Sequence, residues 1–103
     1  MTMIEVINLV EDIRPLELSH SQPVRFLQEL EGKIELEIHQ KKEWEKTETL
    51  SVPAPYDRVY WLYLLCVLDM LYGEEKHYLR EKAAFEEALA DYAYYYRTHV
   101  AQN

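Results

Sequence analysis

Glycine and cysteine are scarce in this chain. Its 103 residues include two glycines, four prolines and one cysteine. So few turn-forming residues argue against an all-β fold with many tight turns, and also against a disordered chain. A single cysteine cannot form a disulfide within the chain, which suits a cytosolic protein. Because this residue, Cys66, lies in an apolar stretch, we expect it to be a small, buried core residue.

Basic residues are also few. Eleven lysines and arginines stand against nineteen aspartates and glutamates, which gives a formal net charge of -8. Proteins that neutralise DNA phosphates need a basic surface, and no basic cluster here exceeds Lys41-Lys42. The charge therefore argues against sequence-specific nucleic-acid binding. An acidic wall that lets DNA slide past without sticking remains compatible with it.

Long apolar runs are missing as well. The most apolar run, Val59–Leu68, ends at Asp69 and is shorter than the roughly 20 residues that a transmembrane helix needs. Residues Met1–Val10 lack both the basic start and the long apolar stretch of a secretory signal peptide. We therefore expect no membrane association.

Motifs for catalysis or metal binding are not found. The four histidines are scattered, and none follows a ligand spacing such as His-Glu-x-x-His. No nucleophile elbow and no glycine-rich phosphate loop is present. The paired acids Glu74-Glu75 and Glu86-Glu87 are adjacent on predicted helices, so they point in different directions and resemble solvated faces. We predict that the protein is not an enzyme and holds no metal or cofactor.

Helical periodicity dominates the first forty residues. Thr2–Asp12 has apolar residues at helix spacing behind a Thr-x-x-Glu capping box, and Arg14-Pro15 ends this helix. Leu16–His20 is a connector, and a second helix starts near Ser21-Gln22-Pro23. Gly32 costs this helix about 1 kcal/mol relative to alanine, and either close approach of another helix or solvent exposure explains it. The buried stripe is predicted to be Leu27, Leu30, Ile34 and Ile38, with Glu29, Lys33, Glu35 and Glu37 on the outer faces.

Two further helices are predicted in the second half. Tyr56–Tyr72 is apolar nearly all round, so other elements must cover it on more than one side. Gly73 supplies a C-terminal turn, and a helix from about Glu74 to His99 follows. The short connection makes this pair an antiparallel hairpin. We predict one all-α domain, residues 1–103: a small bundle of three to four helices with a C-terminal antiparallel hairpin and an extended central loop or arm.

The linker or arm is predicted at residues 41–55. Residues Lys41–Lys46 either continue the second helix or leave it. The next six, 47–52, alternate polar and apolar, which favours a short edge strand or an extended arm. Because the chain offers no partner strand, we expect this arm to add as a strand to another protein. Its predicted contact residues are Thr47, Thr49, Leu50 and Val52.

Tyrosines crowd the last predicted helix. The run Tyr92–Arg97 places aromatic side chains on every side, and at most about half of such a helix can face its own core. We expect the rest to meet a partner, because interfaces favour tyrosine and arginine. The alternative is that the tyrosines cap the bundle with their hydroxyls in water. The contact residues predicted on the two helices are Tyr60, Tyr63, Tyr94, Tyr95, Arg97 and His99.

Asp69 is the one polar residue that falls on the apolar surface of its helix. Either it reaches solvent at the helix end, or it is a partly buried acid bonded to a tyrosine or to Arg80. Neither interpretation implies catalysis.

Several segments together resemble a known family. The central one runs Pro53-Ala54-Pro55-Tyr56-Asp57 and continues through Val59-Tyr60 and a leucine-rich helix to Asp69 and Tyr72-Gly73-Glu74. Upstream, Val24–Ile34 contains an aromatic–leucine pair and a Leu-acid-Gly step, and the end contains Ala83–Ala88 and Tyr96-Arg97-Thr98-His99. In this order they resemble the small head–tail connector proteins of prophages from Gram-positive bacteria, over most of the chain outside Gln40–Leu50. The chain departs from the family at Tyr78–Glu81, where relatives carry an asparagine-rich patch, and in its shorter linker.

This resemblance implies a structural role in a virion. Such subunits assemble as a ring, typically of twelve copies, beneath the portal protein after DNA packaging. The ring extends the DNA channel and docks a tail-side or stopper protein. The implied location is the neck of the virion, after assembly in the cytoplasm of the bacterial host. The alternative function is a small regulatory protein-binding module, of the anti-repressor or inhibitor type, that acts through its tyrosine-rich helical surface.

Overall fold

Four α-helices account for most of the residues that the computed structural model describes, namely 1–14 and 21–101. They are α1 (Met3–Ile13), α2 (Ser21–Lys33), α3 (Arg58–Leu71) and α4 (Glu75–Tyr95). Two π-helical segments extend them: η1 (Ile34–Ile38) follows α2, and η2 (Tyr96–Val100) follows α4. Within the described residues there is no strand, only an isolated antiparallel bridge between Thr2 and Thr49. The predicted all-α fold is confirmed, while the predicted connector at residues 16–20 lies outside the described part.

The start of α1 follows its sequence signal. The Thr2 hydroxyl accepts a hydrogen bond from the Glu5 backbone N–H at 3.2 Å, and the Thr2 N–H donates to the Glu5 carboxylate at 2.9 Å. This reciprocal pair is the predicted capping box. It lowers the pKa of Glu5, because hydrogen bonds from the backbone and side chain of Thr2 favour the ionised form.

The helix formed by α2 and η1 ends before Lys41–Lys46, the residues for which a continued helix was one of the two predictions. Its last residue is Ile38, and Gln40 then adopts a φ of 56°, in the left-handed region. This conformation turns the chain out of the helix, so Lys41–Lys46 form part of a loop. Continuation of the helix through these residues is therefore wrong.

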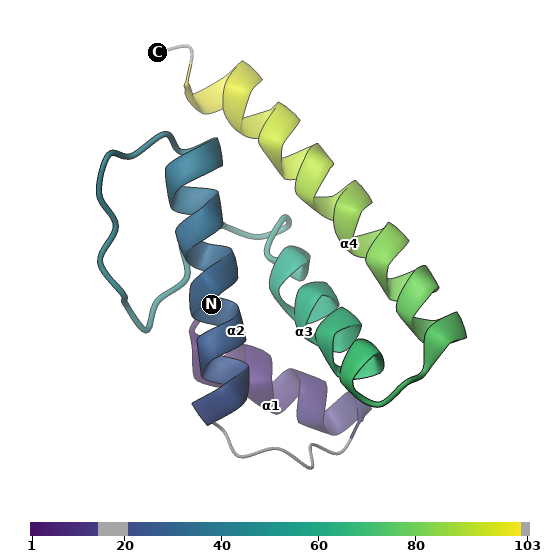
Figure 1. The fold of residues 1–103 in the computed structure, drawn as a ribbon. Coiled ribbons are helices and arrows are strands. Elements are labelled where there is room, and N and C mark those ends of the chain that lie inside the picture. The colour runs from purple at the N-terminus through teal and green to yellow at the C-terminus, as the bar shows by residue number, and fades with distance from the viewer. Residues whose placement is uncertain (15–20, 102–103) are drawn as a thin grey trace.

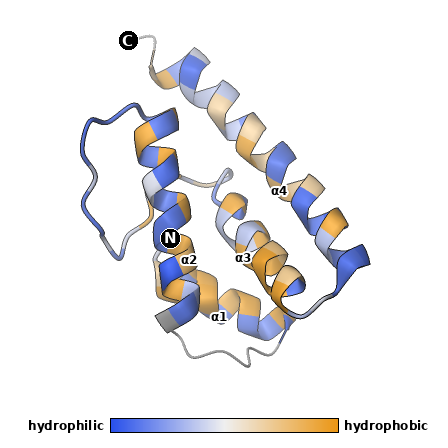
Figure 2. Ribbon diagram, in the orientation of Figure 1, coloured by the Kyte–Doolittle hydropathy of each residue, from blue (hydrophilic) through white to orange (hydrophobic). Residues whose placement is uncertain are grey.

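Helix α3 lies at the centre of the molecule, between α1 and α2 on one side and α4 on the other (Figure 1). Figure 2 shows hydrophobic residues concentrated on α1 and α3, whereas the loop after η1 is largely hydrophilic. Fully burying a leucine or valine contributes roughly 1.5–3 kcal/mol, so this helix is the main source of core stability. The core residues of α3 are Val59, Tyr60, Leu64, Leu65 and Leu68, and their partners include Val6, Ile7, Val10, Leu27, Leu30, Ile34, Ala88 and Tyr92.

Helices α3 and α4 are joined by the short segment 72–74 and pack along each other (Figure 1). Gly73 in this segment has a φ of 72°, a conformation that glycine adopts without steric cost. Cys66 is buried on α3, as predicted. The long α4 helix covers one flank of α3 and continues beyond it toward the end of η1.

The loop between η1 and α3 folds back onto the helices. We call its residues 41–52 the 41–52 loop. The Met3 N–H donates to the Glu48 carbonyl at 3.0 Å, and the Leu50 N–H donates to the Met1 carbonyl at 2.9 Å. The Trp44 ring lies so close to Gly32 that an added Cβ would be 3.0 Å from it. Gly32 therefore accommodates an indole from this loop, and neither solvent exposure nor a neighbouring helix explains it.

Candidate interaction surface

A buried carboxylate attaches the 41–52 loop to the helices. Glu31 is only 1% exposed. Its two oxygens accept hydrogen bonds from the Ser51 backbone N–H at 2.6 Å and from the Tyr60 hydroxyl at 2.7 Å. The Tyr60 hydroxyl in turn accepts from the Val52 N–H at 3.0 Å. Burial, the charge of Glu31 and the hydrogen bond to it raise the pKa of Tyr60, so this hydroxyl stays protonated and remains a donor.

A second buried carboxylate lies one helical turn further on. Glu35 was predicted on an outer face, but it is buried and bonded to His39 and Lys41. Burial opposes ionisation of Glu35, yet the hydrogen bonds and charges of Lys41 and His39 outweigh burial and lower its pKa. The same contact raises the pKa of Lys41. The prediction failed because helical periodicity treats every acid as solvated, whereas here His39 at the end of η1 and Lys41 at the start of the 41–52 loop bond to it.

His39 extends this network to α4. The His39 ring is bonded to Glu35 through Nδ1, and its Nε2 lies 2.5 Å from the Tyr92 hydroxyl, a group that can donate to it. Burial, followed by the nearby Tyr96 and Glu35, raises the pKa of Tyr92 and keeps this donor protonated. A hydrogen-bonded series of an acid, an imidazole and a hydroxyl group is also found in catalytic sites. Tyr92 is only 2% exposed, and this hydrogen-bonded network joins η1 to α4.

Aromatic rings pack together at the end of the molecule where His39 meets α4. Tyr56, just before α3, stacks on Tyr95 with ring centroids 4.7 Å apart, and Tyr95 stacks on His99 at 5.1 Å. The Tyr96 ring packs against the His39 ring at 4.6 Å. Tyr95 and Tyr96 of the tyrosine run therefore pack against the chain's own Tyr56, just before α3, and His39, just after η1. This internal packing was not predicted, because it needs η1 and residue 56 to meet the end of α4.

The contact residues predicted in the 41–52 loop divide into two kinds. Thr47 and Thr49 are exposed, whereas Leu50 and Val52 are buried in the core. The chain also supplies the backbone partner that we expected from another protein, because Met1 and Met3 pair with the loop. The described residues contain no partner strand, as predicted, but part of the loop backbone is already paired with the N-terminus through an isolated bridge.

The contact residues predicted on the helices also differ in exposure and in position. Tyr60 is fully buried and bonded to Glu31, so it is not accessible to a partner in this fold. Tyr63 is half-buried on α3, some distance along the bundle from the C-terminal end. Tyr94 is 63% exposed, and the exposed side chains of Arg97 and His99 belong to the same last turns. The remaining predicted residue, Tyr95, is half-buried in the stacks described above.

Asp69 has a different partner from those proposed. It is fully buried and forms an ion pair with Arg14 at the end of α1. Arg80, the predicted alternative, is exposed. The pairing could not be read from the sequence, because it joins residues 55 positions apart.

Several exposed apolar side chains escaped prediction. Met70 and Leu71 end α3 and Leu79 lies in the first turns of α4, so the three belong to the region of the α3–α4 turn. The helix Tyr56–Tyr72 was predicted to be covered on more than one side, and this prediction did not indicate which of its apolar residues stay exposed. Elsewhere Ile4, Ile13, Leu36 and Val100 are also exposed.

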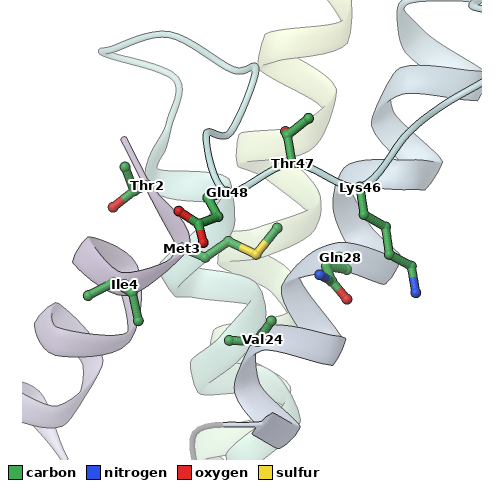
Figure 3. A pocket seen from close by; sticks show the side chains of 8 residues that line it. All are labelled: Thr2, Met3, Ile4, Val24, Gln28, Lys46, Thr47 and Glu48. Atoms are coloured by element: carbon green, nitrogen blue, oxygen red, sulfur yellow. The ribbon is translucent and has the colours of Figure 1, made fainter.

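A hollow of about 400 Å³ opens where the N-terminus, α2 and the 41–52 loop meet (Figure 3). Met3 and Val24 give it an apolar floor, and Lys46 and Glu48 from the loop form a charged edge. Among residues 1–14 and 21–101, no three His, Cys, Asp or Glu side chains are grouped to hold a metal ion.

No helix in the described part of the chain is long and apolar enough to cross a membrane. Comparison with protein families, with curated proteins and with solved structures found no match to this chain.

Proposed function

We propose that the chain is a subunit of a phage head–tail connector. It acts by assembly and catalyses no reaction. Its copies form a ring beneath the portal protein, extend the DNA channel and dock a tail-side or stopper protein. The subunit is made in the bacterial host cytoplasm and resides in the neck of the virion.

One observation carries this proposal: the two most specific segments of the family resemblance lie in contact. Tyr56 of the Pro53–Asp57 motif stacks on Tyr95, which stacks on His99 of the Tyr96–His99 motif. Arg58, next to the first motif, also pairs with Asp91 on α4 at 3.2 Å. Segments that meet in space have a structural reason to recur together, which supports a shared fold.

The proposed contact surfaces are the accessible members of the predicted set. Tyr94, Arg97 and His99 offer an aromatic and basic surface at the end of the C-terminal antiparallel hairpin, and such residues are favoured at interfaces. Thr47 and Thr49 offer the exposed side of the central arm. The acidic chain contributes a channel wall that does not retain DNA.

The test is assembly with purified portal protein. Native mass spectrometry and negative-stain electron microscopy of the mixture should reveal a closed ring of this chain on the portal ring. The double variant Tyr94→Ala/Arg97→Ala should lose ring formation, and Leu36→Ala, which truncates an exposed side chain elsewhere, should retain it. Failure to join the portal, together with tight one-to-one binding to a soluble regulator, would instead support the regulatory binding module.

A further inference from the structure

An apolar groove runs between α3 and α4 on the flank away from the tyrosine-rich end. Its volume is about 260 Å³. The Tyr63 and Phe85 rings pack against each other in its wall, with centroids 5.1 Å apart. We call this the α3–α4 groove, and its apolar lining is Tyr63, Cys66, Val67, Met70, Tyr78 and Phe85.

The groove continues into exposed apolar surface. Met70, which lines it, is 56% exposed, and the exposed Leu71 and Leu79 lie near the same turn. A second hollow shares Met70 and Tyr78 and reaches Gly73. Exposed apolar side chains gathered in one region mark an interaction site more often than isolated ones do. Methionine also adapts its shape readily to a partner.

The charges around the groove are predominantly negative. Glu86 and Lys82 line it, and Glu75 lines the adjoining hollow. Burial raises the pKa of the Cys66 thiol, and the charges that act on this thiol are Lys82, Glu81 and Glu86. The residues that line the two hollows therefore include three carboxylates, of which Asp69 is already paired with Arg14. They include one ammonium group, that of Lys82, whose nitrogen lies 5.9 Å from the centre of the Tyr78 ring.

We propose that the α3–α4 groove docks a basic amphipathic helix of a different protein. Its apolar face would contact Met70 and Phe85, and its lysines or arginines would lie against Glu75, Glu81 and Glu86. A groove between two helices accepts a helix through apolar residues spaced three and four apart. A second copy of this chain fits less well in this groove, because none of its helices α1 to α4 carries more basic than acidic residues. This inference does not depend on the connector function.

The experiment uses the full chain and a fluorescently labelled helical peptide with leucines on one face and lysines on the other. Fluorescence anisotropy gives its dissociation constant, which is compared with that of a peptide with the same leucines and glutamates in place of the lysines. We expect the basic peptide to bind and the acidic peptide to bind much more weakly. Amide NMR shifts caused by the basic peptide should fall on the lining residues of α3 and α4.

Two matched variants separate docking from general attraction between an acidic protein and a basic peptide. Met70→Glu and Leu36→Glu each replace an exposed apolar side chain by one negative charge, at 56% and 47% exposure. General attraction predicts equal or tighter binding for both. Docking predicts that Met70→Glu weakens binding about tenfold, the effect of losing one buried apolar side chain, while Leu36→Glu does not weaken it.

A charge variant tests the acidic edge. Glu86→Lys should weaken binding of the basic peptide about two- to fivefold at low salt, and this difference should shrink at high salt. The inference is overturned if both peptides bind equally, if Met70→Glu binds as tightly as the wild type, or if the NMR shifts gather elsewhere. It is also overturned if the free chain self-associates and Met70→Glu alone abolishes that association, because the occupant is then a second copy.

Discussion

Removing one hydroxyl group should destabilise this protein severely. The Tyr60 hydroxyl donates to Glu31 at 2.7 Å and accepts from the Val52 N–H at 3.0 Å. All three residues are buried. Tyr60→Phe keeps the ring and deletes only the oxygen, so Glu31 loses one donor and the Val52 N–H loses its acceptor.

The size of the effect follows from these two bonds. A buried hydrogen bond to a charged group contributes about 1.5–3 kcal/mol, and an unsatisfied buried N–H costs about 1–3 kcal/mol. We expect the free energy of unfolding to fall by about 3 kcal/mol, a large share of the roughly 5–15 kcal/mol that a domain has. For a domain of this size the melting temperature should fall by roughly 10–20 °C.

Urea denaturation followed by circular dichroism measures the change in unfolding free energy. Tyr94→Phe is the matched control, because it deletes the same atom from a side chain that is 63% exposed, and it should change stability by less than about 0.5 kcal/mol. Because the pKa of Tyr60 is raised, the deficit of Tyr60→Phe should be constant from neutral to mildly alkaline pH. A loss no larger than that of Tyr94→Phe would refute the idea that this hydroxyl attaches the loop.

Three further changes test other contacts. The pKa of Glu35 is lowered below its reference of 4.5. Ionised Glu35 therefore stabilises the fold above that pH, and this contribution is lost as the pH falls through the folded-state pKa. Glu35→Gln should accordingly flatten the acid side of the stability–pH curve measured by urea denaturation. Gly32→Ala should destabilise the chain, although alanine favours helices by about 1 kcal/mol, because the new Cβ meets the Trp44 ring at 3.0 Å. Arg14→Met should lower the free energy of unfolding by about 3 kcal/mol in the same assay, because it leaves Asp69 buried without this cation.

The controls for these changes are second substitutions. Gly32→Ala combined with Trp44→Ala should regain the helix-propensity benefit relative to Trp44→Ala alone. Arg14→Met combined with Asp69→Leu should recover most of the lost stability, because no buried charge remains. Additive losses in either double variant would contradict the contacts described here. An unchanged acid side for Glu35→Gln would contradict the role of its network.

Features set by neighbouring residues were predictable. The capping box at Thr2, the glycine turn at Gly73 and the burial of Cys66 each follow from a few adjacent residues or from one helical stripe. The end of the α2–η1 helix was not predictable, because Gln40 carries no composition signal for a left-handed backbone.

Features that join distant segments were not predictable. The tyrosine run suggested a surplus aromatic surface, whereas Tyr95 and Tyr96 pack on Tyr56 and His39, which are far away in the sequence. Glu35 is a different case, because its partners His39 and Lys41 lie only four and six residues further on. Periodicity placed Glu35 in solvent because it records polarity alone and does not predict the turn at Gln40 that precedes Lys41. The accessible part of the predicted surface is smaller than expected, and the exposed apolar residues near the α3–α4 turn were overlooked.

The π-helical segments η1 and η2 restrict insertions and deletions at the ends of α2 and α4. Each residue added to or removed from a helix rotates everything after it by about 100°. Deleting one residue from η1 would swing His39 away from Tyr92, and deleting one from η2 would move His99 away from the Tyr95 ring. Insertions and deletions should therefore spare both segments and be tolerated better at the exposed loop residues Glu45 and Lys46. Substitutions within η1 and η2 should be tolerated more readily than any change in their length.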